Sequence, residues 1–186
     1  MSFQNAVLGL VIERPGYGYD LSRRINARVA GLDVSESAVY PALVALERKG
    51  WVRRRDPAAR ASRGRIWFDP TAAGREAFDA WMDQPSPPLR GDLRWKIAVA
   101  SHKKLPALIE ETREEEQACL DRIELLTSDA GEPIDPIAEW APTGRRLLRR
   151  TDVKELQAKI ESLQEVRATM KQTLRQRARR AYRVPR

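Results

Sequence analysis

Apolar residues recur at helical spacing along most of this 186-residue chain. The spacing predicts three short helices at the start, over residues 3–13, 19–30 and 35–50. The first is apolar on nearly every side, so we expect it to be buried. The inward-facing residues of the other two recur every three or four positions: Leu21, Ile25, Val29, Val39, Leu43 and Leu46. Three short helices joined by turns, the third with a polar face, form a helix-turn-helix pattern.

The third predicted helix has a second face without large aliphatic side chains near its start. This face carries Ser37, Ala38 and Tyr40, and either Ser35 or Ser37 can cap the first turn. A helix that buries one stripe and presents small polar residues with a tyrosine on the other suits a DNA major groove. Under this interpretation, Tyr19 at the start of the second helix anchors a phosphate. A helix that only packs in the core is the alternative.

After residue 50, the spacing of apolar residues changes from that of helices to that of β-strands. "WVRRR" and "RIWF" are short runs of aromatic and β-branched residues, and Pro57 and Gly64 between them favour a turn. We predict a hairpin whose tip carries Arg60, Arg63 and Arg65. Such a hairpin after three helices is a wing, and its arginines can reach backbone phosphates or a minor groove. The alternative is an exposed hairpin that its arginines only keep soluble.

A fourth helix and a cluster of prolines close the first domain. Thr71 is placed to cap a helix over residues 71–83, in which Phe78 and Trp81 form the inward stripe. Three prolines by residue 88 then stop the helix. The expected divisions are a winged helix-turn-helix domain, a proline-rich linker and a helical dimerisation domain with a basic tail: residues 1–84, 85–89 and 90–186. The predicted fold class is mainly α with a small β-hairpin.

The second half of the chain is predicted to be helical, over residues 90–100, 105–126 and 143–180. The last of these helices has the most regular period in the sequence. Its apolar residues alternate by three and four around one charged position, Arg167: Val153, Leu156, Ile160, Leu163, Met170 and Leu174. This pattern is typical of a coiled-coil seam and predicts a homodimer interface. Packing onto its own domain is the alternative.

Charge is distributed unevenly along the chain, whose formal net charge is +8. Residues 167–186 hold eight cations and no acid, so the rest of the chain sums to zero. Within that rest, residues 53–65 hold six arginines and one aspartate, whereas residues 110–132 hold nine acids and two arginines. Two basic regions indicate a polyanionic partner. A basic region can also be only a solvated face or a tail.

The scarcity of reactive side chains argues against an enzyme. The chain has one cysteine, Cys119, and one histidine, His102, which exclude a disulfide framework and a zinc site of the usual spacing. The acidic run "EETREEE" is more plausibly a solvated helix face than a metal site, and we expect no cofactor. No apolar stretch is long enough to cross a membrane, and no signal peptide is visible. We therefore expect a cytoplasmic protein.

Three segments together resemble the winged-helix domain of the PadR family of bacterial transcriptional regulators. They are "VLGLVIERPGYGYDLSRRI", "LDVSESAVYPALVALERKGWV" and "GRIWFDPTAAGREAF", within residues 5–81. The chain departs from the family pattern at Pro70, where such proteins usually carry leucine, and in a wing that is unusually rich in arginine. The wing's preference for bases or phosphates therefore cannot be carried over.

The resemblance implies a homodimer that binds double-stranded DNA at an operator with two-fold symmetry. It also implies repression that a small molecule or another signal relieves. Some PadR-like proteins receive planar ligands on aromatic residues at their dimer interface, so Trp95, which lies beside the apolar stripe of its helix, is a candidate effector contact. Trp95 can instead fill the core. A non-specific architectural binder driven by the arginine tail is the alternative function, and an enzyme on a winged-helix scaffold is the less favoured one.

Overall fold

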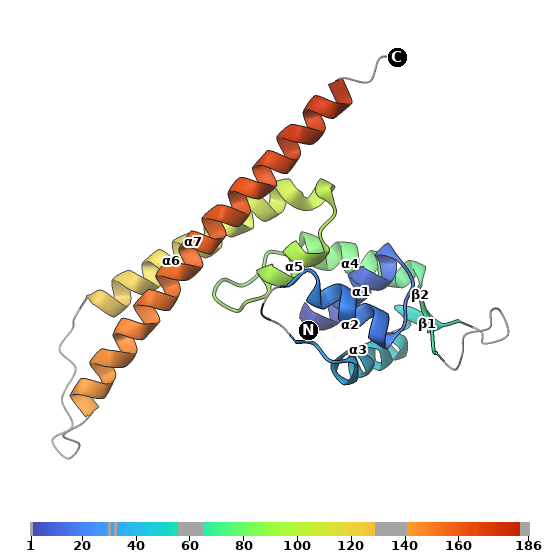
Figure 1. The fold of residues 1–186 in the computed structure, drawn as a ribbon, viewed down its shortest axis with the longest axis horizontal. Helices are drawn as coiled ribbons and strands as arrows, with labels where there is room; N and C mark the ends of the chain where they lie inside the picture. The colour runs from blue at the N-terminus through green and yellow to red at the C-terminus, as the bar shows by residue number, and fades with distance from the viewer. Residues whose placement is uncertain (1, 30, 32, 56–64, 129–140, 183–186) are drawn as a thin grey trace. The chain divides into compact units, whose positions relative to one another are not determined.

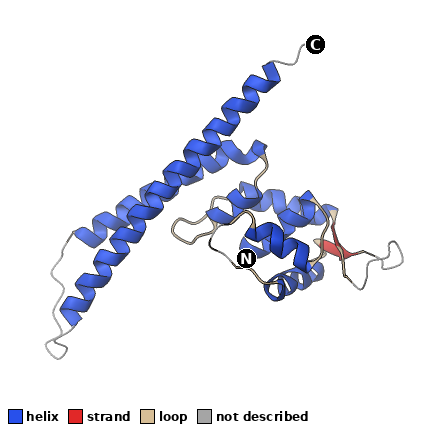
Figure 2. Cartoon of the chain, in the orientation of Figure 1, coloured by secondary structure: helices blue, strands red, loops and turns tan. Residues whose placement is uncertain are grey.

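A computed structural model describes residues 2–29, 31, 33–55, 65–128 and 141–182. The chain divides into two compact units, Met1–Ser86 with Arg90–Lys104, and Pro87–Leu89 with Leu105–Arg186. The described residues are mostly helical, and their only sheet is a two-stranded antiparallel one (Figure 2). The predicted fold class, mainly α with a small hairpin, is confirmed.

Within the described residues, the first unit contains five α-helices, a short 3-10 helix (His102–Lys104) and both strands (Figure 1). Its elements are α1 (Ser2–Glu13), α2 (Gly18–Asn26), α3 (Glu36–Arg48), β1 (Val52–Arg54), β2 (Phe68–Pro70), α4 (Ala72–Asp83) and α5 (Leu93–Val99). Helix α1 packs against α2, α3, α4 and α5, which explains why it is apolar on nearly every side. Five of the six predicted inward residues are confirmed, since Leu21, Ile25, Val39, Leu43 and Leu46 are all fully buried. The sixth, Val29, lies after the end of α2 and is only half-buried.

Helix α2 ends earlier than its apolar period suggested, at Asn26 instead of residue 30. The Asn26 side chain explains the difference, because its amide forms hydrogen bonds with both the backbone N–H and the backbone carbonyl of Val34. Its Nδ2 donates to the Val34 carbonyl at 3.1 Å, and its Oδ1 accepts from the Val34 N–H at 2.9 Å. An asparagine that bonds to the backbone in this way stabilises a turn better than another helical turn.

The predicted hairpin after α3 is confirmed, although its second strand lies further along the chain than expected. Strands β1 and β2 pair with Val52 opposite Pro70 and Arg54 opposite Phe68. Phe68 also bonds to Gly16, whose carbonyl accepts from the Phe68 N–H at 2.9 Å. The second strand therefore starts at Phe68, where it is paired on both sides, and not at residue 65. This bridge fixes the base of the wing to the turn before α2.

Thr71 caps α4, as predicted. Its hydroxyl oxygen accepts from the Gly74 N–H at 3.0 Å and its hydroxyl donates to the Gly50 carbonyl at 2.7 Å. Gly74 lies so close to Trp51 that a β-carbon on it would be 2.0 Å from the Trp51 carbonyl oxygen. The Thr-x-x-Gly pattern thus joins the start of α4 to the end of α3.

The sequence spacing of Leu93, Ile97 and Ala100 predicts that these residues form the apolar face of α5, and this prediction is wrong. Leu93 is buried as expected, but Trp95 and Lys96 are buried as well, whereas Ile97 is only half-buried. Trp95 packs edge-on against Phe3 of α1, with 5.3 Å between ring centroids. A helix of seven residues is too short for a periodic stripe to decide which face is buried, and α1 decides it instead. Residues 90–104 consequently group with the first unit and not, as the expected domain division has it, with the second.

The second unit is a hairpin of two long antiparallel helices, α6 (Leu105–Thr127) and α7 (Ala141–Tyr182) (Figure 1). Helix α6 buries Leu108, Ile109, Thr112, Glu115 and Cys119. On α7, Leu163 and Met170 are buried, so these two members of the predicted seam are covered by their own chain. Among the described residues, no helix is long and apolar enough to cross a membrane.

Candidate nucleic-acid interface

Helix α3 has one buried face and, at its start, one exposed face. Val39, Leu43 and Leu46 are fully buried, whereas Ser37 and Ala38 are exposed. Ser35 lies at the N-cap position, but its side chain makes no cap hydrogen bond, and its hydroxyl instead lies 2.7 Å from the Ser37 hydroxyl. The predicted side-chain cap is therefore wrong. The result is a helix end with two hydroxyls and one methyl group facing outward.

Tyr40 joins α3 to the start of α2. Its ring packs on Gly18, where a β-carbon would lie 2.8 Å from Tyr40 Cε2. The side chain is half-buried. Tyr40 thus has a packing contact, as the core alternative required, and it still has exposed surface next to Ser37. The glycine in "PGYGY" is needed for this close approach, because any side chain there would displace the ring.

Tyr19 lies at the start of α2 and is half exposed. The guanidinium of Arg23 lies over its ring, 6.0 Å from the centroid, and the ring of Tyr17 stacks 6.5 Å away. An arginine held over an aromatic ring keeps its charge near the surface in a defined place. Tyr19 therefore has a cation beside its ring at the surface.

The base of the wing meets the same group of aromatic residues. The Arg65 guanidinium lies over the ring of Tyr17 at 4.9 Å, and Trp67 packs against the same ring at 5.3 Å. Sequence reasoning found Tyr19 and Arg65 but missed Tyr17, Trp67 and Arg23. The i, i+4 spacing of Tyr19 and Arg23 was a usable signal. No sequence signal could have revealed the contact of Tyr17 with the wing, because this contact depends on the bridge between Gly16 and Phe68.

The wing arginines divide by their partners. Arg54 pairs with Glu47 at 2.9 Å, and Arg55 pairs with Asp69, which holds the pKa of that carboxyl below its usual range. Within the part of the chain that the structure describes, Arg53 and Arg65 form no ion pair and are exposed. The predicted contacts Arg60 and Arg63 lie outside the described residues.

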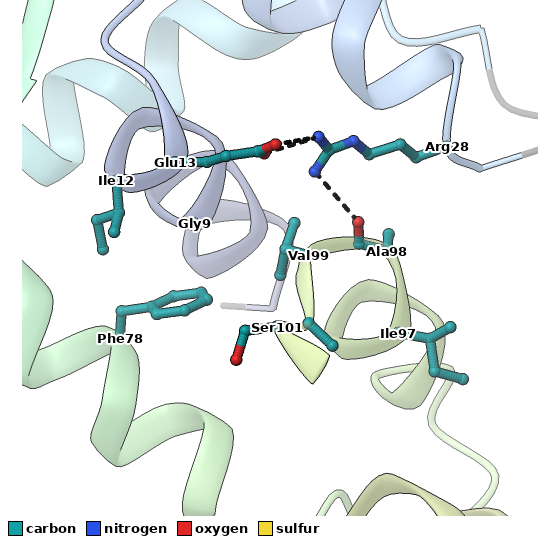
Figure 3. Close-up of a pocket in the computed structure, with 10 residues that line it drawn as sticks. Gly9, Ile12, Glu13, Arg28, Phe78, Ile97, Ala98, Val99 and Ser101 are labelled. Atoms are coloured by element: carbon teal, nitrogen blue, oxygen red, sulfur yellow. Dashed lines mark hydrogen bonds and ion pairs between the residues drawn. The ribbon is translucent and has the colours of Figure 1, made fainter. Parts of the chain in front are cut away.

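A second feature of the first unit is an open cleft between α1, α4 and α5, of about 610 Å³ (Figure 3). Phe78, Ile12 and Val99 form its apolar wall. Its charged residues bind one another, because Arg28 donates to the Glu13 carboxylate at 2.6 and 2.8 Å and to the Ala98 carbonyl at 3.4 Å. Trp95, the predicted effector contact, does not line this cleft. Among the described residues, no group of acids, histidines and cysteines could hold a metal ion.

The fold and the exposed helix end define a winged-helix protein of the transcriptional-regulator class. Residues 7–80 match the model of the transcriptional regulator PadR-like family. This match agrees with the resemblance inferred from the sequence motifs, which is confirmed for these residues. The match ends within α4, so it covers the helix-turn-helix and the wing.

Several solved structures are similar to the chain. One is Bacillus subtilis PadR in complex with operator DNA, with 16% identity and a TM-score of 0.39 over 90% of this chain and 97% of that chain. Another is the PadR-like transcriptional regulator BC1756 from Bacillus cereus, with 19% identity and a TM-score of 0.37 over 91% of this chain and 98% of that chain. Bacillus subtilis PadR in complex with p-coumaric acid is also similar, with 16% identity and a TM-score of 0.40 over 92% of this chain and 99% of that chain. No curated protein matches the sequence. The family assignment stands on the match of residues 7–80.

Proposed function

We propose that the protein is a homodimeric transcriptional regulator that binds double-stranded DNA sequence-specifically, at an operator with two-fold symmetry, and acts mainly as a repressor. The observation that carries this proposal is the start of α3, where a fully buried stripe is combined with an outward set of small polar residues. The wing base and the start of α2 place cations beside it. Occupation of the operator by two such units would block transcription sterically.

The outward residues of α3 are assigned to the bases. Ala38 and the ring of Tyr40 can touch thymine methyl groups, and the Ser37 hydroxyl can bond to a base edge. Tyr19 is assigned to a phosphate, because the residue is half exposed and Arg23 lies over its ring. The wing arginines, Arg65 with Arg60 and Arg63, are assigned to the backbone or the minor groove.

The second unit supports the dimer. Four of its leucines are between 45% and 67% exposed: Leu120, Leu125, Leu147 and Leu148. Four of the seam residues are only half-buried, and they are available to a second copy: Val153, Leu156, Ile160 and Leu174. Leu163 and Met170 are committed to their own chain, so the interface we propose combines the exposed leucines with the half-buried part of the seam.

An effector is part of the proposal, since a repressor that is relieved needs a signal. It would act by binding one arrangement of the two DNA-reading units better than the other. The burial of Trp95 against Phe3 supports a packing role for this residue. The cleft beside Phe78 is therefore the better candidate for a planar aromatic ligand. To test this, wild type and Phe78→Ala are titrated with planar aromatic acids while tryptophan fluorescence is recorded. A change in fluorescence in both proteins, or in neither, would show that the cleft is not the effector site.

Selection of bound DNA from a random pool tests the main proposal. We expect an enriched inverted repeat, and we expect a variant with Ser37→Ala and Tyr40→Phe to lose affinity for it more than for random DNA. Binding without enrichment, with a steep dependence on salt, would overturn the proposal in favour of a non-specific architectural binder.

A further inference from the structure

The last described turns of α7 are basic and carry no acid. Residues 171–180 contain five cations: Lys171, Arg175, Arg177, Arg179 and Arg180. We call these five residues the basic end of α7. The four arginines are exposed, and Lys171 is partly so. Within the described residues, none of the five has an acidic partner. The neighbouring Arg167 differs, because it pairs with Glu116.

The basic end lies where α7 loses its partner helix. Helix α7 has 42 residues and α6 has 23, which correspond to lengths of about 63 and about 35 Å at 1.5 Å per residue. Glu116 of α6 contacts Gln164 and Arg167, and α6 begins eleven residues before Glu116. The two helices are antiparallel (Figure 1), so counting back from these contacts puts the start of α6 near residue 176 of α7.

The apolar stripe of α7 also ends there. Leu163, Met170 and Leu174 follow a spacing of seven and four residues, and the next position of the stripe, three residues on, is Arg177. A stripe that packed on another helix would continue with an apolar residue. The basic end is therefore not shaped for a further helix of this chain.

A helix with this charge needs an external counter-charge. Lys171, Arg175 and Arg179 are spaced by four residues, and like charges at i, i+4 destabilise a helix. We propose that the basic end of α7 binds the phosphate backbone of double-stranded DNA, separately from the winged helix. The charge complementarity is direct, because each contact would replace cation–cation repulsion by a cation–phosphate pair.

The composition of the basic end favours DNA over other polyanions. Four of its five cations are arginines, whose planar fork binds two phosphate oxygens at once. An anionic membrane would require an apolar face on the same helix, which residues 175–180 lack. Single-stranded RNA would require aromatic residues for stacking, and none lies within residues 171–180.

A second copy of the acidic helix α6 is a weaker candidate for the counter-charge. Its two acids nearest the hairpin interface, Glu115 and Glu116, already bind Lys159 and Arg167 of the same chain. Glu110 pairs with Arg113 at 2.6 Å. DNA phosphates, by contrast, have no partner other than mobile counterions, which are released when a cation binds.

The test replaces Arg175, Arg177, Arg179 and Arg180 by glutamine in the full chain. A matched control replaces the four arginines at the other end of the same helix by glutamine: Arg145, Arg146, Arg149 and Arg150. The control changes the net charge equally, but its region is close in sequence to four acids within residues 129–139. Circular dichroism and sedimentation should show that both variants keep the helix content and oligomeric state of the wild type.

Affinity for a duplex of random sequence is measured by fluorescence anisotropy over a series of salt concentrations. Each phosphate that the variant no longer neutralises should reduce the slope of log affinity against log salt by about 0.9. The slope should therefore fall by roughly 2 to 3.6 in the test variant and by less than about 1 in the control. Affinity for random DNA and for a selected operator should fall by the same factor. Loss of the operator preference alone would instead reflect the winged helix, so the two proposals fail separately.

Three results would overturn the inference. One is an unchanged affinity and slope in the test variant. Another is an equal fall in the test and control variants, which would mean that net charge alone matters. The third is a loss seen only on vesicles containing phosphatidylserine, or only on single-stranded RNA, which would assign the basic end to a different partner.

Discussion

The two units of the chain are held together by different interactions. In the first unit, residues from α1, α2 and α3 are fully buried in one apolar core. In the hairpin of α6 and α7, the contacts across the interface include Glu115 with Lys159 and Glu116 with Arg167, and the best-buried apolar residues of α7, Met170 and Leu163, remain 6% and 8% exposed. We therefore expect the first unit to be stable as a monomer and the hairpin to depend more on a partner.

The exposed leucines of the hairpin lead to the same conclusion. Burial of apolar surface contributes about 25 cal/mol per Å² to stability, so exposed leucines are stabilising contacts that have not been made. They are spread over both helices, as Leu120 and Leu125 on α6 and Leu147 and Leu148 on α7. A partner that covers them would complete the second unit. We therefore expect the first unit to unfold independently of protein concentration and the hairpin to depend on it.

The largest effect is expected from a core residue of the first unit. Leu43→Ala should destabilise that unit by about 3 to 5 kcal/mol, because it removes fully buried methyl groups and leaves a cavity. Leu163→Ala in the hairpin should cost about 1 to 2 kcal/mol, because the smaller core there can relax. Urea unfolding separates the two, since tryptophan fluorescence reports mainly on the first unit, which holds four of the five tryptophans: Trp51, Trp67, Trp81 and Trp95. An equal loss of unfolding free energy in the two variants would show that the two units do not differ in this way.

The next effect concerns the dimer. Leu125→Asp combined with Leu148→Asp places two charges on the proposed interface without touching the core of the monomer. We expect dimerisation to weaken by at least about 100-fold, which corresponds to roughly 2.7 kcal/mol. Sedimentation velocity at micromolar concentration should show a monomer, whereas the control Leu125→Met with Leu148→Met should stay dimeric. A dimer in the aspartate variant would place the interface elsewhere.

The sequence predicted the helices of both units. Helices with strong periodic stripes were correct to within a few residues, and the Thr71 cap followed from local chemistry alone. The motifs also identified the family over the same region. These features depend on neighbours in the sequence, which is why the residue pattern was sufficient to find them.

What the sequence did not predict depends on long-range partners. Arg167 looked like a flaw in a coiled-coil seam, and Glu116 looked like part of a solvated acidic face, but they are an ion pair across the hairpin. The position of Trp95 depends on Phe3, far away in the chain. Neither periodicity nor composition contains the identity of such partners, so both residues were assigned from their own helix alone.

A smaller effect tests whether Tyr40 acts in binding or in packing. Tyr40→Phe keeps the ring on Gly18 and removes only the hydroxyl, so it should lower operator affinity by about 1 kcal/mol, or roughly fivefold, without changing the melting temperature. Tyr40→Ala should also destabilise the first unit by about 1 to 2 kcal/mol, less than a fully buried aromatic residue would. Affinity and melting are measured on both. A normal affinity in Tyr40→Ala would exclude contact with DNA.

The smallest effect is the pH-dependent contribution of Glu116 to the stability of the hairpin. The first unit has an acid-sensitive pair of its own, Asp69 with Arg55, which the substitution leaves unchanged. Hydrogen bonds from Arg167 and Gln164 hold the pKa of Glu116 below its ordinary value of 4.5. A carboxyl whose pKa is lowered by folding stabilises the folded state above its unfolded pKa, and this contribution is lost as the pH falls through the folded pKa. Glu116→Gln should therefore destabilise the hairpin by about 1 kcal/mol or less at pH 7, since the pair is partly exposed to solvent. The difference from wild type should shrink below about pH 4.5. Urea unfolding followed by circular dichroism at pH 7, 5 and 3 measures it, and tryptophan fluorescence of the same samples provides the internal control. A difference that stays constant down to pH 3 would show that glutamine disturbs packing, and that the charge of Glu116 does not hold the two helices together.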